Sequence, residues 1–469
     1  MRSSYTAEFN FSKYLEQVVD AETILYIGRV VAVRGLDIEC EGPRSAIGEI
    51  CTIKLNNGKS ILAEVVGLEG KIVRVTAFGD TKGIEVGCEV IATGAMLQVP
   101  VGMSLLGRVV DATGHAYDDL GEIEPECYYP AINNPPSPMS RKPVERRITT
   151  GVRSIDSMLT VGKGQRLGIF AGSGVGKSTL LSMIARNTDA DVNVIGLIGE
   201  RGREVLDFIK RDLGEEGLKR SVVVVATSDQ PAICRLRSAY VCTAIAEYFR
   251  DKGKDVMLMF DSVTRFAEAQ REIGLANGEP PAQKGFPPSV FDLIPKLLER
   301  AGTNDKGSIT AFYTVLVSGD DMNEPITDRV RGTLDGHIVL NRKLANAFHY
   351  PAIDILQSIS RLSKRVTGKN TQKACGKIRT LMAMYQEKET VITTGLYSKG
   401  TSPELDLAID MHDKIEEFLK QEEFEPSTME QTLKKLSELT GIDIPESEFS
   451  ESPLIVATQE QEKLVSVEN

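Results

Sequence analysis

The sequence predicts an α/β protein with an N-terminal β-barrel, a central doubly wound α/β domain and a C-terminal helical domain. Three observations lead to this prediction. Short runs of alternating apolar and polar residues fill 23–94, mainly apolar runs alternate with helical patterns over 165–340, and helix-forming residues dominate after Arg361. Alternating runs broken by turn residues are typical of small antiparallel barrels, whereas continuous apolar runs are typical of parallel strands buried on both faces. The length of 469 residues suits roughly three domains.

Individual elements follow from the same patterns. Ser427 with Glu430 three residues later is the pattern of a capping box, which predicts the start of the last helix there. From Ile444 onward the sequence is acidic and aperiodic, which predicts a mobile tail. The expected strands of the central domain are 167–170, 194–198, 222–226, 256–260 and 309–317, and the expected helices are 204–213, 232–249, 403–419 and 428–439. The expected parts are a helical segment over 1–22, a barrel over 23–94, an α/β domain over 95–361, a helical domain over 362–440 and an acidic flexible tail over 441–469.

Composition narrows the class of protein. With 41% hydrophobic and 26% charged residues the chain is expected to be globular, and its net charge of −11 argues against broad electrostatic capture of nucleic acid. The seven cysteines include no C-x-x-C pair, and the four histidines show no metal-ligand spacing. Neither a signal peptide nor a membrane span is evident, so we expect a cytoplasmic protein.

The strongest chemical signal is the run Ala171-Gly172-Ser173-Gly174-Val175-Gly176-Lys177-Ser178-Thr179, which follows an apolar run and precedes a helical pattern. Glycines let the backbone N–H groups face phosphate oxygens, Lys177 supplies a charge to the β- and γ-phosphates, and Ser178 can ligate Mg²⁺. The run therefore predicts a P-loop that binds Mg-ATP, although Ala171 stands where the strict pattern has glycine. The alternative is a chance glycine-rich turn.

Two further carboxylates stand at the ends of apolar runs. Asp261 follows the apolar run 256–260, and a P-loop protein is expected to place a carboxylate that serves the Mg²⁺ ion at the end of such a second strand. Glu200 belongs to the charged run 199–204 at the exit of another apolar run, from which a carboxylate can reach the γ-phosphate. From the residues alone, a solvated charge cluster that caps the following helix explains Glu200 equally well.

Taken in order, the segments 171–179, 199–205, 256–266, 279–302 and 350–361 resemble the α/β-type ATPases, the superfamily of rotary ATP synthase catalytic subunits. The run Pro351-Ala352-Ile353-Asp354-Ile355-Leu356-Gln357-Ser358-Ile359-Ser360-Arg361 is highly specific to that superfamily. Within it the sequence is most similar to the flagellar and type III protein-export ATPases, in the P-loop, in 199–205, in Gly285-Phe286-Pro287-Pro288-Ser289-Val290-Phe291 and in the barrel segment 28–53.

The resemblance implies a central RecA-like P-loop domain that hydrolyses ATP. It makes Glu200 the carboxylate that activates the attacking water, and so favours the functional interpretation of this residue. Arg201 and Arg265 are expected near the γ-phosphate, Glu204 near the water shell of the Mg²⁺ ion, and Asp261 beside the metal.

Two other matched residues have alternatives that remain open. Tyr350 matches the position whose ring stacks on adenine, although a lone aromatic before a proline is more often part of a core. Arg361 matches the arginine finger that enters a neighbouring subunit's site and stabilises charge on the transferring phosphoryl group. An intrachain salt bridge is the alternative for Arg361.

The resemblance also implies an assembly and its partners. A homohexamer would energise release, unfolding and export of substrate proteins at the cytoplasmic face of the inner membrane, with export-gate membrane proteins and chaperone-substrate complexes as partners. Phe11, Tyr14, Leu15 and Val18 lie at helical spacing in the segment that binds a stator or regulator protein in these ATPases, and packing on the chain's own barrel is the alternative.

Two other functions share the same ATP chemistry. Three features disfavour a subunit of a rotary proton-translocating ATP synthase: the residue sequence of the loops, the segment 401–419, and the presence of both Glu200 and Arg361. A hexameric RNA translocase is disfavoured by the acidic net charge and by the lack of a basic, aromatic-rich platform for single strands. We therefore expect no nucleic-acid partner.

Overall fold

The computed structural model describes residues 25–453 except 36, 318 and 320. These residues fall into two compact units, whose boundary lies between Met96 and Leu97. The expected helical segment over 1–22, with its regulator contact, lies outside the described residues.

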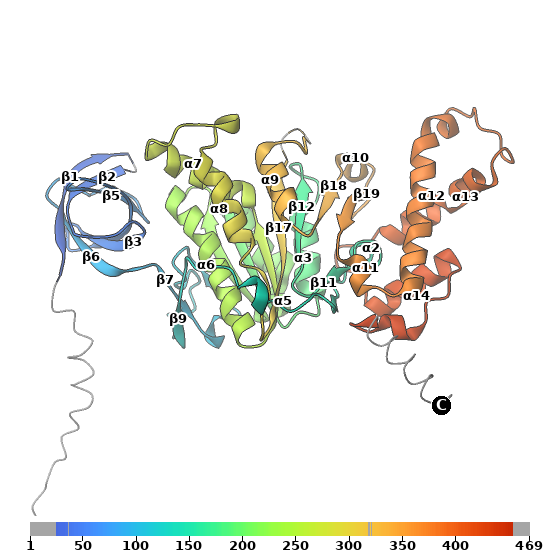
Figure 1. Ribbon diagram of the computed structural model, residues 1–469, viewed down its shortest axis with the longest axis horizontal. Helices are drawn as coiled ribbons and strands as arrows, with labels where there is room; N and C mark the ends of the chain where they lie inside the picture. Colours follow the sequence, from blue (N-terminus) through green and yellow to red (C-terminus); the bar gives the residue numbers. More distant parts are fainter. Residues whose placement is uncertain (1–24, 36, 318, 320, 454–469) are drawn as a thin grey trace, which may run out of the picture. The chain divides into compact units, whose positions relative to one another are not determined.

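The first unit is a closed antiparallel barrel with the strand order β1-β2-β5-β4-β3-β6 (Figure 1). Its strands alternate as the sequence predicts: in β2, Ile38 and Cys40 are buried in the barrel core, whereas Asp37 and Glu39 are only half-buried. The predicted barrel is therefore confirmed. Its strands are β1 Ile27–Arg34, β2 Asp37–Glu41, β3 Glu49–Lys54, β4 Ser60–Glu69, β5 Ile72–Ala77 and β6 Glu89–Met96.

The second unit is built on a mainly parallel sheet with the order β19-β18-β12-β17-β15-β13-β14-β8 (Figure 1). The five strands expected from apolar runs are present and pair in parallel, while β19 runs antiparallel to β18 at one edge. The strands of this sheet are β8 Val109–Val110, β12 Arg166–Ala171, β13 Val192–Glu200, β14 Ser221–Thr227, β15 Asp255–Asp261, β17 Ser308–Leu316, β18 Gly336–Leu340 and β19 Ile353–Ser360, with β16 Gly302–Thr303 beside β17; the short pairs are β7 Gln98–Val101 with β9 Cys127–Pro130, and β10 Arg147–Ile148 with β11 Val161–Gly162.

Helices cover both faces of this sheet, which explains why its strands are apolar along their whole length. The long helix α6 packs on β13, β14 and β15, whereas α3 shares a core cluster with Ile195, Met257 and Phe312. The helix expected over 204–213 is divided, because a π-helical turn, Phe208–Leu213, follows α4. The helices are α2 Arg153–Met158, α3 Lys177–Asn187, α4 Gly202–Asp207, α5 Gly214–Lys219, α6 Ala232–Asp251, α7 Val263–Ala276, α8 Pro288–Leu298, α9 Pro325–Thr333 and α10 Arg342–Asn346.

The C-terminal helices share their core with the α/β domain. Leu433 and Leu436 of α14 belong to the same buried cluster as Leu181 and Ile184 of α3. No helix within the described residues combines the length with the apolar character that a membrane span needs. These helices are α11 Ser363–Val366, α12 Lys369–Thr393, α13 Pro403–Leu419 and α14 Met429–Thr440.

The capping box of α14 lies one residue later than expected. The Thr428 hydroxyl accepts a hydrogen bond from the backbone N–H of Gln431 at 3.2 Å, and the Thr428 N–H donates to the Gln431 side chain at 3.1 Å. Ser427 is buried and bonds to the Thr432 hydroxyl instead. Both pairs have capping-box spacing, and burial of Ser427 decides between them.

The prediction of a mobile tail from Ile444 is wrong as far as Pro453. The Glu448 carboxylate accepts hydrogen bonds from the backbone N–H groups of Asn370 and Thr371, at 2.9 and 2.8 Å. It thereby caps the first turn of α12, which has no capping side chain of its own. A segment that acts as a cap needs no apolar periodicity, so the sequence pattern does not reveal it.

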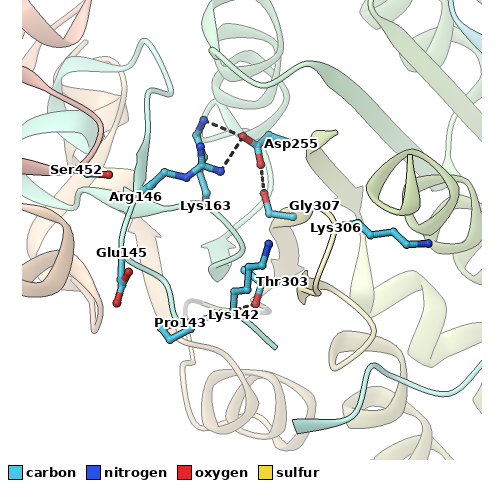
Figure 2. Close-up of a pocket in the computed structure, with 11 residues that line it drawn as sticks. Lys142, Pro143, Glu145, Arg146, Lys163, Asp255, Thr303, Lys306, Gly307 and Ser452 are labelled. Atoms are coloured by element: carbon cyan, nitrogen blue, oxygen red, sulfur yellow. Dashed lines mark hydrogen bonds and ion pairs between the residues drawn. The ribbon is translucent and has the colours of Figure 1, made fainter. Parts of the chain in front are cut away.

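Ion pairs hold the same segment further along the chain. The Lys163 ammonium lies 2.9 Å from the Asp255 carboxylate and 3.1 Å from that of Glu451. Arg146 also reaches Asp255, at 3.5 Å, across a cavity of about 370 Å³ at the amino ends of β15 and β17 (Figure 2). Residues 444–453 are thus attached both to α12 and to the sheet.

Replacing the cap should loosen the C-terminal helices. Gly368 leaves room for Glu448, since a Cβ atom at Gly368 would lie 2.0 Å from the Glu448 Cδ. We expect Glu448→Ala to lower the free energy of unfolding by about 1–2 kcal/mol, the usual loss for a helix cap that also carries charge. Urea denaturation followed by circular dichroism measures this, with Glu446→Ala on the exposed side of the same turn as the control. Equal stability of the two variants would contradict the capping role.

Candidate active site

The loop between β12 and α3 has the backbone of a phosphate cradle. Gly174 and Gly176 adopt left-handed φ values of 75° and 91°, which only glycine adopts without strain. Among the described side chains none caps the start of α3, so its first N–H groups face the loop. Such a helix start attracts anions through these N–H groups and the helix dipole.

The parallel register brings two carboxylates to this loop. Asp261 ends β15 and Glu200 ends β13, and Leu197 of β13 is paired with Asp261. The Lys177 ammonium lies 2.6 Å from Asp261 Oδ1 and 3.6 Å from Glu200 Oε1. The Thr314 hydroxyl of β17 donates to the same Asp261 oxygen at 2.7 Å. Strands that lie far apart in the sequence thus place both acids beside one lysine.

The electrostatics of this cluster differ between its members. Burial raises the pKa of Glu200, the nearby Asp261 carboxylate raises it further, and Lys177 opposes them, so the pKa is about 7. Burial lowers the pKa of Lys177, but Asp261 and Glu200 more than offset burial and the net shift is upward. A carboxylate with a pKa near neutrality is suited to accept a proton from water, and an ammonium whose pKa is raised is suited to bind phosphate.

Two arginines and a glutamate border the same space. Gly199 has a left-handed φ of 72°, and a Cβ atom there would lie 2.9 Å from the Arg265 side chain, so this glycine lets β13 approach α7 closely. Arg201 is exposed and pairs with Glu204 at 3.3 Å. A cavity of about 570 Å³ is lined by these side chains together with the loop, namely Gly172, Ser173, Gly174, Gly176, Lys177, Ser178, Thr179, Gly199, Glu200, Arg201, Glu204, Ser228, Arg265, Leu316 and Tyr350.

An aromatic cavity adjoins the loop on its other side. A Cβ atom at Gly176 would lie 3.4 Å from the Tyr350 ring, and Tyr350, Phe348 and Pro351 line a space of about 480 Å³. The backbone N–H of Gln421, from the C-terminal helical region, donates to the Tyr350 carbonyl at 2.9 Å. Sequence reasoning missed both neighbours: Phe348 could have been found as a second aromatic two residues before Tyr350, whereas nothing local indicates Gln421.

Arg361 does not join this cavity. Tyr350 precedes β19 and Arg361 follows it, so eight strand residues separate them, a span of roughly 26 Å at about 3.3 Å per residue. The register pairs Ile353 with Leu340 near the P-loop end of the sheet, and Ser360 with Gly336 at the opposite end. The Arg361 side chain is exposed, and within the described part of the chain it forms no ion pair.

The residues present fit a magnesium nucleotide. Mg²⁺ takes oxygen ligands, usually one or two from protein and the others from phosphates and water. Ser178 is exposed and directly follows Lys177, whose ammonium lies 2.6 Å from the Asp261 carboxylate. These two oxygens, with Glu204 on the cavity wall, are the groups that would hold the ion, whose positive charge would neutralise phosphate oxygens.

The fold and the site together define a P-loop nucleotide-binding protein with a barrel before the nucleotide domain. Family models match in three places: the ATP synthase alpha/beta family beta-barrel domain over 30–94, the nucleotide-binding domain of that family over 151–360, and the T3SS EscN ATPase C-terminal domain over 367–438. The chain belongs to the ATP synthase alpha/beta family.

Individual relatives narrow the position within this family. The chain is 56% identical over 433 residues to the flagellum-specific ATP synthase of Treponema pallidum (strain Nichols), covering 92% of this chain and 97% of the relative. It is 50% identical to the type 3 secretion system ATPase of Xanthomonas euvesicatoria over 414 residues, covering 88% and 94%. The assembled ATPase EscN of the enteropathogenic E. coli type III secretion system has a TM-score of 0.84 at 43% identity, covering 88% of this chain and 100% of that one. The protein is an ATP-hydrolysing member of the flagellar and type III secretion branch.

The P-loop lysine provides the first test of the site. Lys177→Ala removes the ammonium that lies between Asp261 and Glu200, and with it the point charge offered to the β- and γ-phosphates. We expect affinity for Mg-ATP to fall by roughly 100-fold, the scale of a charge-assisted hydrogen bond. Isothermal calorimetry measures this, with Lys434→Ala on the exposed face of α14 as a control that should bind normally. Unchanged affinity would remove the P-loop assignment.

The strand-end glutamate provides the second test. Glu200→Gln keeps the shape of the side chain but cannot accept a proton, so nucleotide binding should persist while kcat falls by roughly 10²- to 10⁴-fold. Calorimetry and steady-state phosphate release measure the two effects, with the exposed Glu215→Gln as the control. Loss of ATP binding in this variant would show that Glu200 is structural.

Proposed function

We propose that this chain is the ATPase of a flagellar or type III protein-export apparatus and that it works as a homohexamer. Hydrolysis of Mg-ATP would energise the release, unfolding and export of substrate proteins. In the site, Glu200 activates water, Arg201 and Arg265 lie near the γ-phosphate, and Tyr350 stacks on adenine. Ser178, Asp261 and Glu204 serve the metal.

The observation that carries the assembly is the position of Arg361. Within one chain the length of β19, roughly 26 Å at about 3.3 Å per residue, separates Arg361 from the Tyr350 end of the P-loop cavity, and the exposed Arg361 has no ion pair among the described residues. A guanidinium is the group best suited to stabilise charge that spreads over a phosphoryl group. Because it cannot do so in its own chain, Arg361 serves the site of a neighbouring copy.

The match of the C-terminal helices favours export over the rotary alternative. Residues 367–438 fit the model of the T3SS EscN ATPase C-terminal domain, and this region includes α12 and α13, which pack against each other beside the nucleotide domain. A relative is described as assembled ATPase EscN, and another structure as EscN with its central stalk EscO. By analogy we infer a stalk protein as a partner of this chain.

Further partners are inferred from the same family. The segment 1–22 would bind a stator or regulator protein, and the assembly would act at the cytoplasmic face of the inner membrane on chaperone-substrate complexes and export-gate proteins. The acidic net charge of −11 supports protein rather than nucleic-acid partners.

The assembly can be tested by mixing variants. The ATPase rate per chain should rise steeply with protein concentration, because a lone chain has Lys177, Asp261 and Glu200 but lacks a neighbour's arginine. Glu200→Gln and Arg361→Ala chains should each be inactive alone and regain activity when combined, since one interface then pairs an intact Glu200 with an intact Arg361. Phosphate release and analytical ultracentrifugation measure both effects.

The contrary result is equally clear. A specific activity that stays flat with concentration, together with no gain on mixing, would remove the homohexamer. A rotary subunit would behave in this way, because it needs a different chain to complete its ring.

A further inference from the structure

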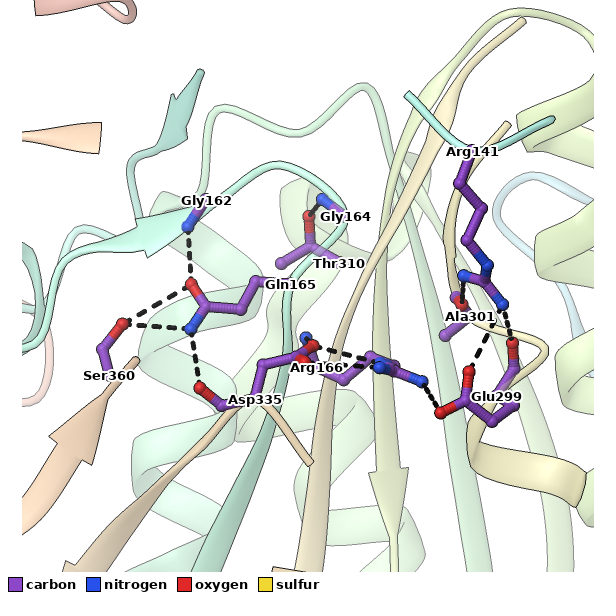
Figure 3. A network of polar contacts seen from close by, with 10 residues as sticks. All are labelled: Arg141, Gly162, Gly164, Gln165, Arg166, Glu299, Ala301, Thr310, Asp335 and Ser360. Atoms are coloured by element: carbon purple, nitrogen blue, oxygen red, sulfur yellow. Dashed lines mark hydrogen bonds and ion pairs between the residues drawn. The ribbon is translucent and has the colours of Figure 1, made fainter. Parts of the chain in front are cut away.

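A buried glutamine lies at the far end of the sheet, next to the end of β19. Gln165 immediately precedes β12 and is fully buried. Its amide group donates to the Ser360 hydroxyl at 3.0 Å and to the Asp335 carbonyl at 3.3 Å, while the Gly162 N–H donates to its amide oxygen at 2.9 Å. Figure 3 shows Gln165 between Ser360 and Asp335, so one side chain joins three segments of the chain.

The same two partners define the backbone around Arg361. The Arg361 N–H donates to the Asp335 carbonyl at 3.0 Å, the oxygen that also accepts from Gln165. The Ser360 hydroxyl, on the residue just before Arg361, donates to the Thr160 carbonyl at 2.9 Å. Both partners of the Gln165 amide are therefore close to Arg361: the Asp335 carbonyl accepts a hydrogen bond from the Arg361 N–H, and Ser360 is the preceding residue.

Two further features make this arrangement rigid. Arg166 holds the Asp335 carboxylate with its backbone N–H and its guanidinium, at 3.1 Å each, and also pairs with Glu299 at 2.6 Å (Figure 3). Gly336 lets β18 and β19 approach closely, because a Cβ atom there would lie 2.4 Å from the carbonyl oxygen of Ile359. Both strands are thus fixed where Arg361 leaves the sheet.

We propose that Gln165 is a positioning residue for Arg361: its amide fixes Ser360 and Asp335, and these fix the backbone from which the guanidinium reaches the neighbouring copy's nucleotide. The inference rests on the proposed trans role of Arg361. It also gives β12 a second task, because the P-loop of the chain's own site follows the carboxyl end of this strand, and the support of the arginine that acts on the neighbour's site lies just before its amino end.

The structure explains why an amide is used here. Gln165 must donate to a hydroxyl and a carbonyl while accepting from a backbone N–H, and only an amide side chain offers both functions at that reach. A methionine has similar length and volume but none of these hydrogen bonds. Gln165→Met should therefore keep the fold while removing one hydrogen bond each from the Ser360 hydroxyl and the Asp335 carbonyl.

The first measurement separates chemistry from binding. We expect Gln165→Met to lower kcat by roughly 10- to 100-fold, the effect of a displacement of about 1 Å in a reacting group, with the KM for ATP unchanged. The matched control is Gln270→Met on α7. It removes another buried amide, which donates to the Ser289 hydroxyl of α8 at 3.0 Å. This variant should leave kcat within about twofold of the unmodified protein.

The second measurement assigns the defect to an interface partner. Mixed with Glu200→Gln chains, Gln165→Met chains should regain activity, because their intact Glu200 sites then meet undisturbed Arg361 side chains. Mixed with Arg361→Ala chains they should not, because neither chain then supplies a well-placed arginine. A defect in the chain's own P-loop site would give the reverse pattern.

The outcomes distinguish this inference from the function on which it rests. Suppose that the reference pair, Glu200→Gln and Arg361→Ala, regains activity on mixing. The positioning role is then overturned if Arg361→Ala chains rescue Gln165→Met chains, or if the kcat of Gln165→Met is normal, while the trans role of Arg361 stands. If that reference pair shows no rescue, the trans arginine and the positioning role both fall. Should Gln165→Met not fold, Ser360→Ala removes one hydroxyl of the same network and must show the same rescue pattern with a smaller loss of kcat.

Discussion

The contact between the Lys177 ammonium and the carboxylates of Asp261 and Glu200 is the interaction on which the rest of the site depends. Two acids this close would repel each other in a buried place, and the lysine between them makes the arrangement tolerable. The parallel sheet supplies the geometry, since β12, β13 and β15 all deliver their carboxyl ends to one edge. Burial and the nearby Asp261 raise the pKa of Glu200, whereas the two carboxylates keep the charge on Lys177 against the opposing effect of burial.

The antiparallel edge strand β19 has the opposite effect. Because β19 runs antiparallel to β18, it begins shortly after Tyr350 near the P-loop and ends just before Arg361 at the other end of the sheet. One strand thus supplies an aromatic to the site of its own chain and an exposed guanidinium to the other end of the sheet. Under the proposed role of Arg361, a single subunit would hold the groups for nucleotide binding but would need a neighbour's arginine for hydrolysis.

The C-terminal region is tied to the nucleotide domain by groups that carry no periodic signal. Gln421 bonds to the Tyr350 carbonyl beside the aromatic cavity, Glu448 caps α12, and Glu451 pairs with Lys163 at the amino end of the sheet. These contacts connect the helices that match the secretion-type C-terminal domain to both ends of the sheet. Movement of those helices would therefore shift Gln421 and with it the Tyr350 backbone that lines the aromatic cavity.

The sequence by itself determined the barrel, the parallel α/β core and the phosphate loop, because each depends on local patterns: alternation, apolar runs, and glycines next to Lys177 and Ser178. It also marked Asp261 and Glu200, since both end apolar strands, but it left the role of Glu200 open until the family resemblance was considered. Only the tertiary structure decided which groups meet. The contact of Phe348 and Gln421 with the Tyr350 region, the cap by Glu448 and the hydrogen bonds of Gln165 to Ser360 and Asp335 join residues that are distant in the chain or lack a repeating pattern. Such contacts depend on strand order and register, which one sequence specifies only through the complete fold.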